Sequence, residues 1–298
     1  MVRESKYVSK EKKNLVAWLK RKESESEVEV MVSSIKKVGV QPLTFQPWKS
    51  IAYDLAYISY VLGAKGCLAV YNKEAEGWGL LNAALHVRYC REKILGSFPK
   101  EEGLRPDIND LSLLASDGIA LGNPHFIHLA MPRLLAAIDD PTLVKGALRP
   151  WKHDVFPNFL IRLYALYVRD QREFNSPNLG SLSDYQYVLD AWEDPDPAKM
   201  AAALNRICDY HVKRTGASAA VRQEFRYNPH ADFPTEIIAI YRVREHLKLP
   251  TPEISHDLVS TPLFHPPVPL PPFQLDILDY VNDQYTQQFG EPLLPPPL

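Results

Sequence analysis

Apolar residues recur at helical spacing along almost the whole chain, and this periodicity constrains the fold more than any other feature. In residues 47–71 one stripe carries Ile51, Leu55, Ile58 and Leu62. Residues 78–95 repeat the pattern after the short turn NKEAEG. Spacings of three and four residues place side chains on one face of an α-helix, and the alternation typical of half-buried strands is rare. The sequence therefore predicts an all-α fold in which these two helices form an antiparallel hairpin.

Amphipathic stretches of the same kind predict further helices. We expect them over residues 5–22, 110–121, 151–170, 182–193, 197–214 and 233–245. The run EVEVMV at 27–32 leaves a short strand open as an alternative to a helix. Short loops punctuated by Gly and Pro are typical of stacked helix pairs, so we expect an array of antiparallel helical hairpins.

The composition changes after Leu249. Residues 261–272 contain six prolines, and the last seven residues contain four more. Such stretches favour extended, polyproline-like backbone, here around one last helix at 273–288. We interpret them as a strap packed along the helical body, with an exposed ligand for SH3-type domains as the alternative. This divides the chain into 1–46 (a basic helix and connector), 47–250 (the helical body) and 251–298 (the strap), unless all three form one domain.

Charge and cysteine content limit the compartment and the classes of partner that we expect for the protein. The 298 residues carry a formal charge of −2, so no global charge favours nucleic acid or an anionic membrane, although residues 1–22 hold eight Lys or Arg against two acids. The aromatic residues follow core spacing rather than basic runs. Three distant cysteines suit a reducing compartment, and no apolar run resembles a signal core or a membrane span. We expect a cytoplasmic protein with neither nucleic acid nor membrane as a partner.

The stretch DYQYVLDAWEDPDP holds five acids and no base within residues 184–196. The acids are Asp184, Asp190, Glu193, Asp194 and Asp196. They cluster at the end of one expected helix, across a connection, and at the start of the next. A solvated capping loop and a docking patch for a basic protein explain this cluster equally well.

Glu236 lies in line with the apolar side of the helix expected at 233–245. On a helical period it shares a stripe with Ile240 and Val243. We expect Asp232 to cap this helix, which places Glu236 near free N–H groups, with Arg242 or Arg244 as its charge partner. The residues interpreted as buried structural polar groups are Asp209, His211, Glu236 and Arg244.

Common catalytic motifs are missing from the sequence. There is no GxSxG, GxxxxGK[ST] or GxGxxG, which argues against the commonest enzyme classes but not against catalysis in general. We expect a binding protein without catalysis, cofactor or metal. One alternative remains, because a histidine, a His-Asp dipeptide and a distant aspartate follow the ligand order of HD-type metal-dependent phosphohydrolases. Those residues are His125, His153, Asp154 and Asp209, which would have to converge on one or two divalent metals.

Two segments of the C-terminal half resemble the immunity protein 49 family of bacterial polymorphic-toxin systems. They are the helix that ends in Asp209-Tyr210-His211, and FPTEIIAIYRVRE at 233–245 with the following LPTPEI and TPL. The resemblance covers residues 184–263. It implies an all-α cytoplasmic immunity protein that binds a cognate toxin domain and blocks its active site, with the acidic run as the expected contact. A helical scaffold that recruits partners through the Pro-rich segment is a further alternative.

Overall fold

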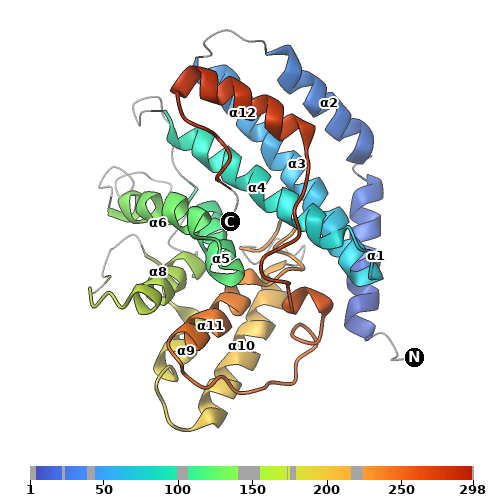
Figure 1. The fold of residues 1–298 in the computed structure, drawn as a ribbon. Helices are drawn as coiled ribbons and strands as arrows, with labels where there is room; N and C mark the ends of the chain where they lie inside the picture. Colours follow the sequence, from blue (N-terminus) through green and yellow to red (C-terminus); the bar gives the residue numbers. More distant parts are fainter. Residues whose placement is uncertain are drawn as a thin grey trace. The chain divides into compact units, whose positions relative to one another are not determined.

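The computed structural model describes residues 5–21, 24–38, 44–98, 107–139, 155–172, 174, 179–215 and 224–296, and these are all-α, without a strand (Figure 1). EVEVMV at 27–32 is helical, within α2. The α-helices are α1 (Lys6–Arg21), α2 (Ser24–Lys37), α3 (Phe45–Asn72), α4 (Gly77–Gly96), α5 (Ile108–Leu121), α6 (Pro124–Asp139), α8 (Phe156–Val168), α9 (Gln186–Asp190), α10 (Pro197–Thr215), α11 (Thr235–His246) and α12 (Asp276–Phe289). None of these described helices is long and apolar enough to cross a membrane.

The chain divides into two compact units. Unit 1 comprises Met1–Arg105 and His265–Leu298, and unit 2 comprises Pro106–Phe264. These boundaries differ from the division at 46 and 250 expected from composition. The proline content indicates only a change of local backbone conformation. The units are defined by the packing of helices against one another, and the C-terminal segment packs with the N-terminal helices.

Helices α3 and α4 form the centre of unit 1 and approach closely at two glycines. A Cβ atom on Gly66 would lie 2.8 Å from Leu81 Cγ, and one on Gly77 would lie 2.6 Å from the Val70 nitrogen. Residue 66 of α3 thus lies close to residue 81 of α4, and residue 70 lies close to residue 77. The glycines are required here because no side chain fits between the backbones.

Helices α1 and α2 pack on α3 through one face each. The buried side chains are Val8 and Leu15 in α1 and Ile35 in α2. Tyr57 of α3 also donates a hydrogen bond to Glu27 of α2. The basic helix expected at the N-terminus is therefore a fixed part of unit 1 rather than an extended arm.

The Pro-rich segment after residue 264 packs along α4. Asn82 Nδ2 donates to the Pro271 carbonyl oxygen at 2.8 Å, and the ring of His86 lies 4.8 Å from that of Phe273. Figure 1 shows the segment passing α4 before α12 begins. These contacts match the strap interpretation, and they engage the segment within its own chain.

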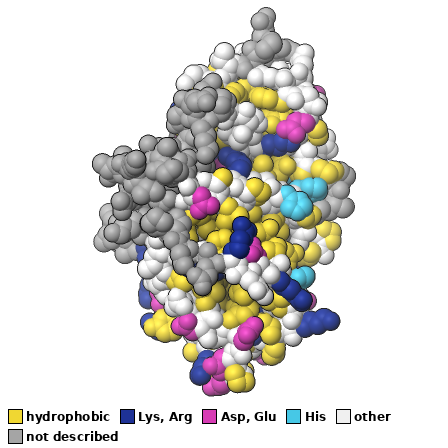
Figure 2. Space-filling view, turned by 90° about the vertical axis from the view of Figure 1, so that its left-hand side faces the viewer, with side chains coloured by type: hydrophobic (Ala, Val, Ile, Leu, Met, Phe, Trp, Pro, Cys, Tyr) yellow, Lys and Arg dark blue, Asp and Glu magenta, His cyan; other side chains and the backbone are white. Residues whose placement is uncertain are grey.

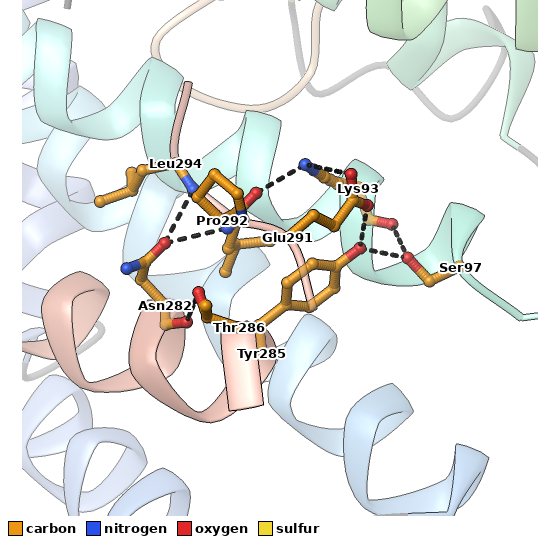
Figure 3. A network of polar contacts seen from close by, with 9 residues as sticks. Lys93, Ser97, Asn282, Tyr285, Thr286, Glu291, Pro292 and Leu294 are labelled. Carbon is orange, nitrogen blue, oxygen red and sulfur yellow. Dashed lines mark hydrogen bonds and ion pairs between the residues drawn. The ribbon is translucent and has the colours of Figure 1, made fainter. Parts of the chain in front are cut away.

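Helix α12 and the turn that follows it close unit 1 (Figure 3). Trp48 Nε1 of α3 donates to Gln288 Oε1 at 3.0 Å. Lys93 Nζ of α4 donates to the Pro292 carbonyl at 2.6 Å and lies 3.6 Å from Glu291 Oε2. Asn282 Oδ1 accepts from the backbone nitrogens of Leu293 and Leu294 at 2.9 and 3.1 Å. The chain is thereby held beyond the end of its last helix.

Unit 2 begins with the helix pair α5 and α6. Asp107 caps α5, accepting hydrogen bonds from the backbone nitrogens of Asn109 and Asp110. A Cβ on Gly118 would lie 2.6 Å from Ile127 Cγ1, so a glycine again permits close approach. Helix α5 also packs against α8 and α11 and is the most completely buried helix of this unit.

Two helices of unit 2 are shorter than expected. The stretch predicted as a helix at 182–193 forms a 3-10 turn, Ser183–Tyr185, followed by the five-residue α9. Ser183 has a positive φ of 46°, which an α-helix cannot contain. The helix expected at 151–170 is described only from residue 155, and α8 covers Phe156–Val168.

Candidate functional site

The acidic residues at 184–196 lie on the surface that α9, the following turn and α10 present. Asp190, Glu193 and Asp196 are exposed, while Asp184 and Asp194 are half-buried. Asp196 Oδ1 accepts from the Ala198 nitrogen at 2.9 Å and so caps α10. We call the surface formed by these five acids with Tyr187 and Arg206 the acidic surface.

Two cations from α10 neutralise part of the acidic surface. Lys199 Nζ lies 2.6 Å from Asp194 Oδ2, and Arg206 Nε lies 2.6 Å from Asp184 Oδ1. The hydrogen bond from Lys199 holds the pKa of Asp194 below its usual range. The sequence run itself contains no base, but a helix that follows it supplies two. Asp190, Glu193 and Asp196 form no ion pair with any residue that the structure describes, and they carry the remaining exposed negative charge.

An exposed aromatic ring lies among these charges. The Arg206 guanidinium lies 4.1 Å from the ring centroid of Tyr187, which is 48% exposed. Arg206 is thus fixed between a ring and a carboxylate, which also pre-positions the tyrosine. Tyrosine and arginine are enriched among the residues that dominate binding energy in protein interfaces.

Figure 2 shows how charge is distributed on one face. At its lower end, where α9 and α10 lie in Figure 1, acidic and basic side chains stand close together between hydrophobic ones. The charge there is mixed rather than a continuous field of one sign.

The question raised by Glu236 has a clear answer in the core of unit 2. His211 Nδ1 of α10 donates to Glu236 Oε1 of α11 at 2.5 Å, and both side chains are fully buried. The His211 ring also stacks on Phe225 at 4.7 Å. His211 and Glu236 are both buried, as expected, and the bond joins two helices of one unit.

Three details of the sequence-based expectation are wrong. Asp209 is 66% exposed, because neighbours in a helix point about 100° apart and its neighbours Cys208 and Tyr210 face the core. Asp232 does not cap α11, whose N-cap residue is Pro234. Arg244 is buried as expected but does not pair with Glu236. It donates to the carbonyl oxygens of Trp192 and Pro250 at 2.6 and 2.5 Å.

A second buried pair escaped the sequence reasoning. Asp117 Oδ1 of α5 accepts from His230 Nε2 and from Thr235 Oγ1, each at 2.8 Å, and all three side chains are fully buried. Asp117 lies in line with Leu113, Leu114 and Leu121, the same signal that singled out Glu236. His230 lies in the irregular segment before α11 and has no periodic signal.

Glu224 forms a third buried site. Its Oε1 accepts from the backbone nitrogens of Val155 and Phe156 at 2.5 and 2.9 Å, at the start of α8. Its Oε2 accepts a short hydrogen bond from the Tyr210 hydroxyl. Burial raises the pKa of Glu224 above its usual range. A glutamate far away in sequence thus occupies the capping position that serves α8.

The chemistry available in this core is limited. Burial raises the pKa of the Cys208 thiol, and the pKa values of the Tyr185 and Tyr210 hydroxyls are raised for the same reason. A nucleophilic cysteine needs a lowered pKa and access to solvent, and Cys208 has neither. The contacts of His211, His230 and Glu224 tie helices together instead.

The HD-type metal set is described only in part. His125 is half-buried at the start of α6, and Asp209 is exposed on α10. His153 and Asp154 lie outside the described residues. Among the described residues, no group of three or more His, Cys, Asp or Glu side chains is arranged to hold a metal ion.

Comparisons with known proteins supply no relative. The sequence matches no protein-family model, and no curated protein and no solved structure shows significant similarity to it.

Proposed function

We propose that this chain is an immunity protein that binds a cognate bacterial toxin domain through the acidic surface and blocks its active site. The observation that carries the proposal is the exposed pair Asp190 and Glu193 beside Tyr187, which Arg206 holds in place. Uncompensated charge accelerates association with a basic partner, and a pre-positioned aromatic ring supplies contact area at low entropic cost.

The location of the resemblance supports the proposal. Residues 184–263 fall within unit 2, so the resembling stretch belongs to one compact body. Its two segments are joined directly by the bond between His211 and Glu236. This contact places His211 and Glu236 in the core of unit 2, whereas Asp190, Glu193 and Asp196 of the acidic surface are exposed.

The mode of action follows from the charge. A toxin that acts on a polyanion has a basic substrate channel, and a carboxylate-rich surface held on a rigid helix pair can occupy that channel. Asp184 and Asp194 are already paired within the chain, so the strongest contacts are expected at Asp190 and Glu193.

The test uses protection as its readout. The tagged protein is used to isolate a stoichiometric partner from its native cells, and the partner domain is then expressed alone and together with this chain. We expect growth arrest by the partner alone and growth on co-expression. Asp190→Lys with Glu193→Lys should abolish protection, and the purified pair should bind at least about tenfold more weakly, since like charges across an interface cost several kcal/mol.

A matched control separates the site from the overall charge. Glu253→Lys with Asp257→Lys makes the same change of charge at two other exposed acids of unit 2 and should leave protection intact. Full protection by the Asp190/Glu193 variant, or equal loss in both variants, would refute the assignment of the acidic surface. A partner that is not toxic would refute the proposed function.

A further inference from the structure

Helix α1 presents a line of lysines to solvent. Lys6, Lys10, Lys13 and Lys20 are all exposed, and no acid shares their face of the helix. At 100° per residue the four fall within about 80° of one another, with Ala17 between the last two. At a rise of about 1.5 Å per residue the line is about 21 Å long. We call these four residues the lysine stripe.

The stripe is held rigidly. Val8 and Leu15 are buried against the rest of unit 1 and lie about 180° around the helix from the stripe. The only acid in α1, Glu11, lies away from the stripe on the half-buried side, where Asn14 Nδ2 donates to it at 2.9 Å. Glu11 approaches the stripe only through Lys10, at 3.8 Å. The other three lysines form no ion pair with any described residue.

Such a line of like charge is unfavourable unless something outside the chain compensates it. Like charges three and four residues apart destabilise a helix by a few tenths of a kcal/mol per pair. The charge is also segregated, since residues 1–22 carry eight bases against two acids in a chain whose net charge is −2. A linear polyanion compensates all four lysines at once.

We propose that the lysine stripe binds the phosphate backbone of a double-stranded nucleic acid without reading its sequence. One strand of a duplex passes about six phosphates in 21 Å, enough to engage every lysine. Phosphate contacts of this kind position a protein and carry no sequence information. The expectation of no nucleic-acid partner rested on total charge and on the aromatic residues, and neither detects a local stripe.

Other anionic partners fit the stripe less well. A helix that enters a membrane surface buries its apolar face among the lipids, but the apolar face of α1 is already packed within unit 1. Lysine is depleted in protein interfaces because its ammonium group is strongly hydrated. The inference rests on unit 1 alone and does not depend on the toxin-binding proposal.

The experiment measures binding of the full chain to short fluorescent DNA and RNA duplexes of unrelated sequence across a series of salt concentrations. For DNA, four phosphate contacts predict a slope of log Kobs against log salt of about −3.6, and unrelated sequences should bind within about twofold of each other. Replacing all four lysines by Gln should weaken binding at low salt by at least about tenfold and reduce the slope by about 1 for each lysine removed.

The control removes the same charge elsewhere. Lys36, Lys37, Lys213 and Lys248 are exposed outside α1, and their joint replacement by Gln should leave the slope unchanged. Thermal melting checks that both variants fold, which we expect because the buried face of α1 is untouched. The proposal is overturned by undetectable duplex binding, by equal loss in both variants, by stronger binding to phosphatidylserine vesicles, or by displacement of the duplex by polyglutamate more readily than by unlabelled duplex.

Discussion

The two units bury their helices in different ways. The buried polar or charged residues described in unit 1 are Ser59, Arg88 and Glu92, and its central pair α3 and α4 meets through glycines and alanines. The described residues of unit 2 include five buried acids, and two of them pair with fully buried histidines. These acids are Asp110, Asp117, Glu224, Asp232 and Glu236.

This difference shows two routes to a specific helical core. In unit 1 shape selects the arrangement, because only glycine allows the backbones at Gly66 and Gly77 to approach. In unit 2 the hydrogen-bond partners of buried carboxylates select the arrangement, because a buried carboxylate without a donor is costly. Helices α5, α10 and α11 must therefore pack in one register. A core of this second kind combines specificity with sensitivity to single substitutions.

The largest effect is expected from Asp117→Ala in unit 2. The change leaves His230 and Thr235 without their shared acceptor in a fully buried site. Breaking a buried pair in this way costs about 3–5 kcal/mol of unfolding free energy. Urea denaturation monitored by circular dichroism measures it. Asp209→Ala, on an exposed acid of the same unit, should stay within about 0.5 kcal/mol of wild type.

The corresponding test in unit 1 is Gly66→Ala. The new methyl group meets Leu81 Cγ at 2.8 Å and the Leu81 nitrogen at 2.9 Å, and overpacking of this kind costs about 1–3 kcal/mol. Gly79→Ala in α4 is the control, because its Cβ meets only the Pro272 oxygen at 3.4 Å and alanine favours a helix. A destabilised Gly79 variant with an unaffected Gly66 variant would contradict the close-packing account.

Substitutions that loosen the C-terminal segment of unit 1 should lower the free energy of unfolding by less than the changes above. Asn282→Ala removes the acceptor for the backbone nitrogens of Leu293 and Leu294, and a lost acceptor at part-buried donors costs about 1–2 kcal/mol. Amide hydrogen exchange should accelerate at Leu293 and Leu294 before it changes in α3. Lys93→Met, which removes the ion pair to the exposed Glu291 and the exposed hydrogen bond to the Pro292 carbonyl, should cost less than about 1 kcal/mol. The reverse ranking would argue that charge, not the amide acceptor, holds the segment.

The smallest expected effect is a change in the free energy of unfolding with pH. Burial raises the pKa of Glu224, so its carboxyl group binds a proton more tightly in the folded than in the unfolded chain. Its contribution to stability is therefore present below the ordinary glutamate pKa and is lost as pH rises through the raised value. The Glu224→Gln variant cannot titrate, so wild type should lose stability relative to it as pH rises from 4.5, with denaturant midpoints as the readout. A wild type that gains relative stability over that range would show that the helix N-terminus outweighs burial.

The sequence predicted the parts of this structure that follow from local periodicity. The helices at 47–71 and 78–95 lie within one to two residues of α3 and α4. The buried His211 and Glu236 were identified because a polar residue on an apolar stripe needs a partner inside the fold. The identity of that partner was not predictable, since an arginine eight residues away in the same helix looked equally suitable.

Non-local pairing explains what was missed. Glu224 caps a helix whose start lies about seventy residues earlier, and no spacing rule connects it with Val155. In the sequence the acids at 184–196 have no basic residue among them. In the structure Lys199 and Arg206 of α10 neutralise two of these acids, because the turn between α9 and α10 places α10 beside them. The exposure of Asp209 was within reach of helical geometry, since both its neighbours belong to the apolar face.

The split of unit 1 between the two ends of the chain has a consequence for biosynthesis. Unit 2 is contiguous, whereas α12, whose Gln288 bonds to Trp48, is made after unit 2. At ribosomal rates of about 5–20 residues per second, α1 to α4 wait roughly 8–32 s for their final partner while the intervening unit is synthesised. Helices α1 to α4 are thus completed only after unit 2 has been made, and their uncovered apolar face at Trp48 is where a nascent-chain chaperone would find this protein.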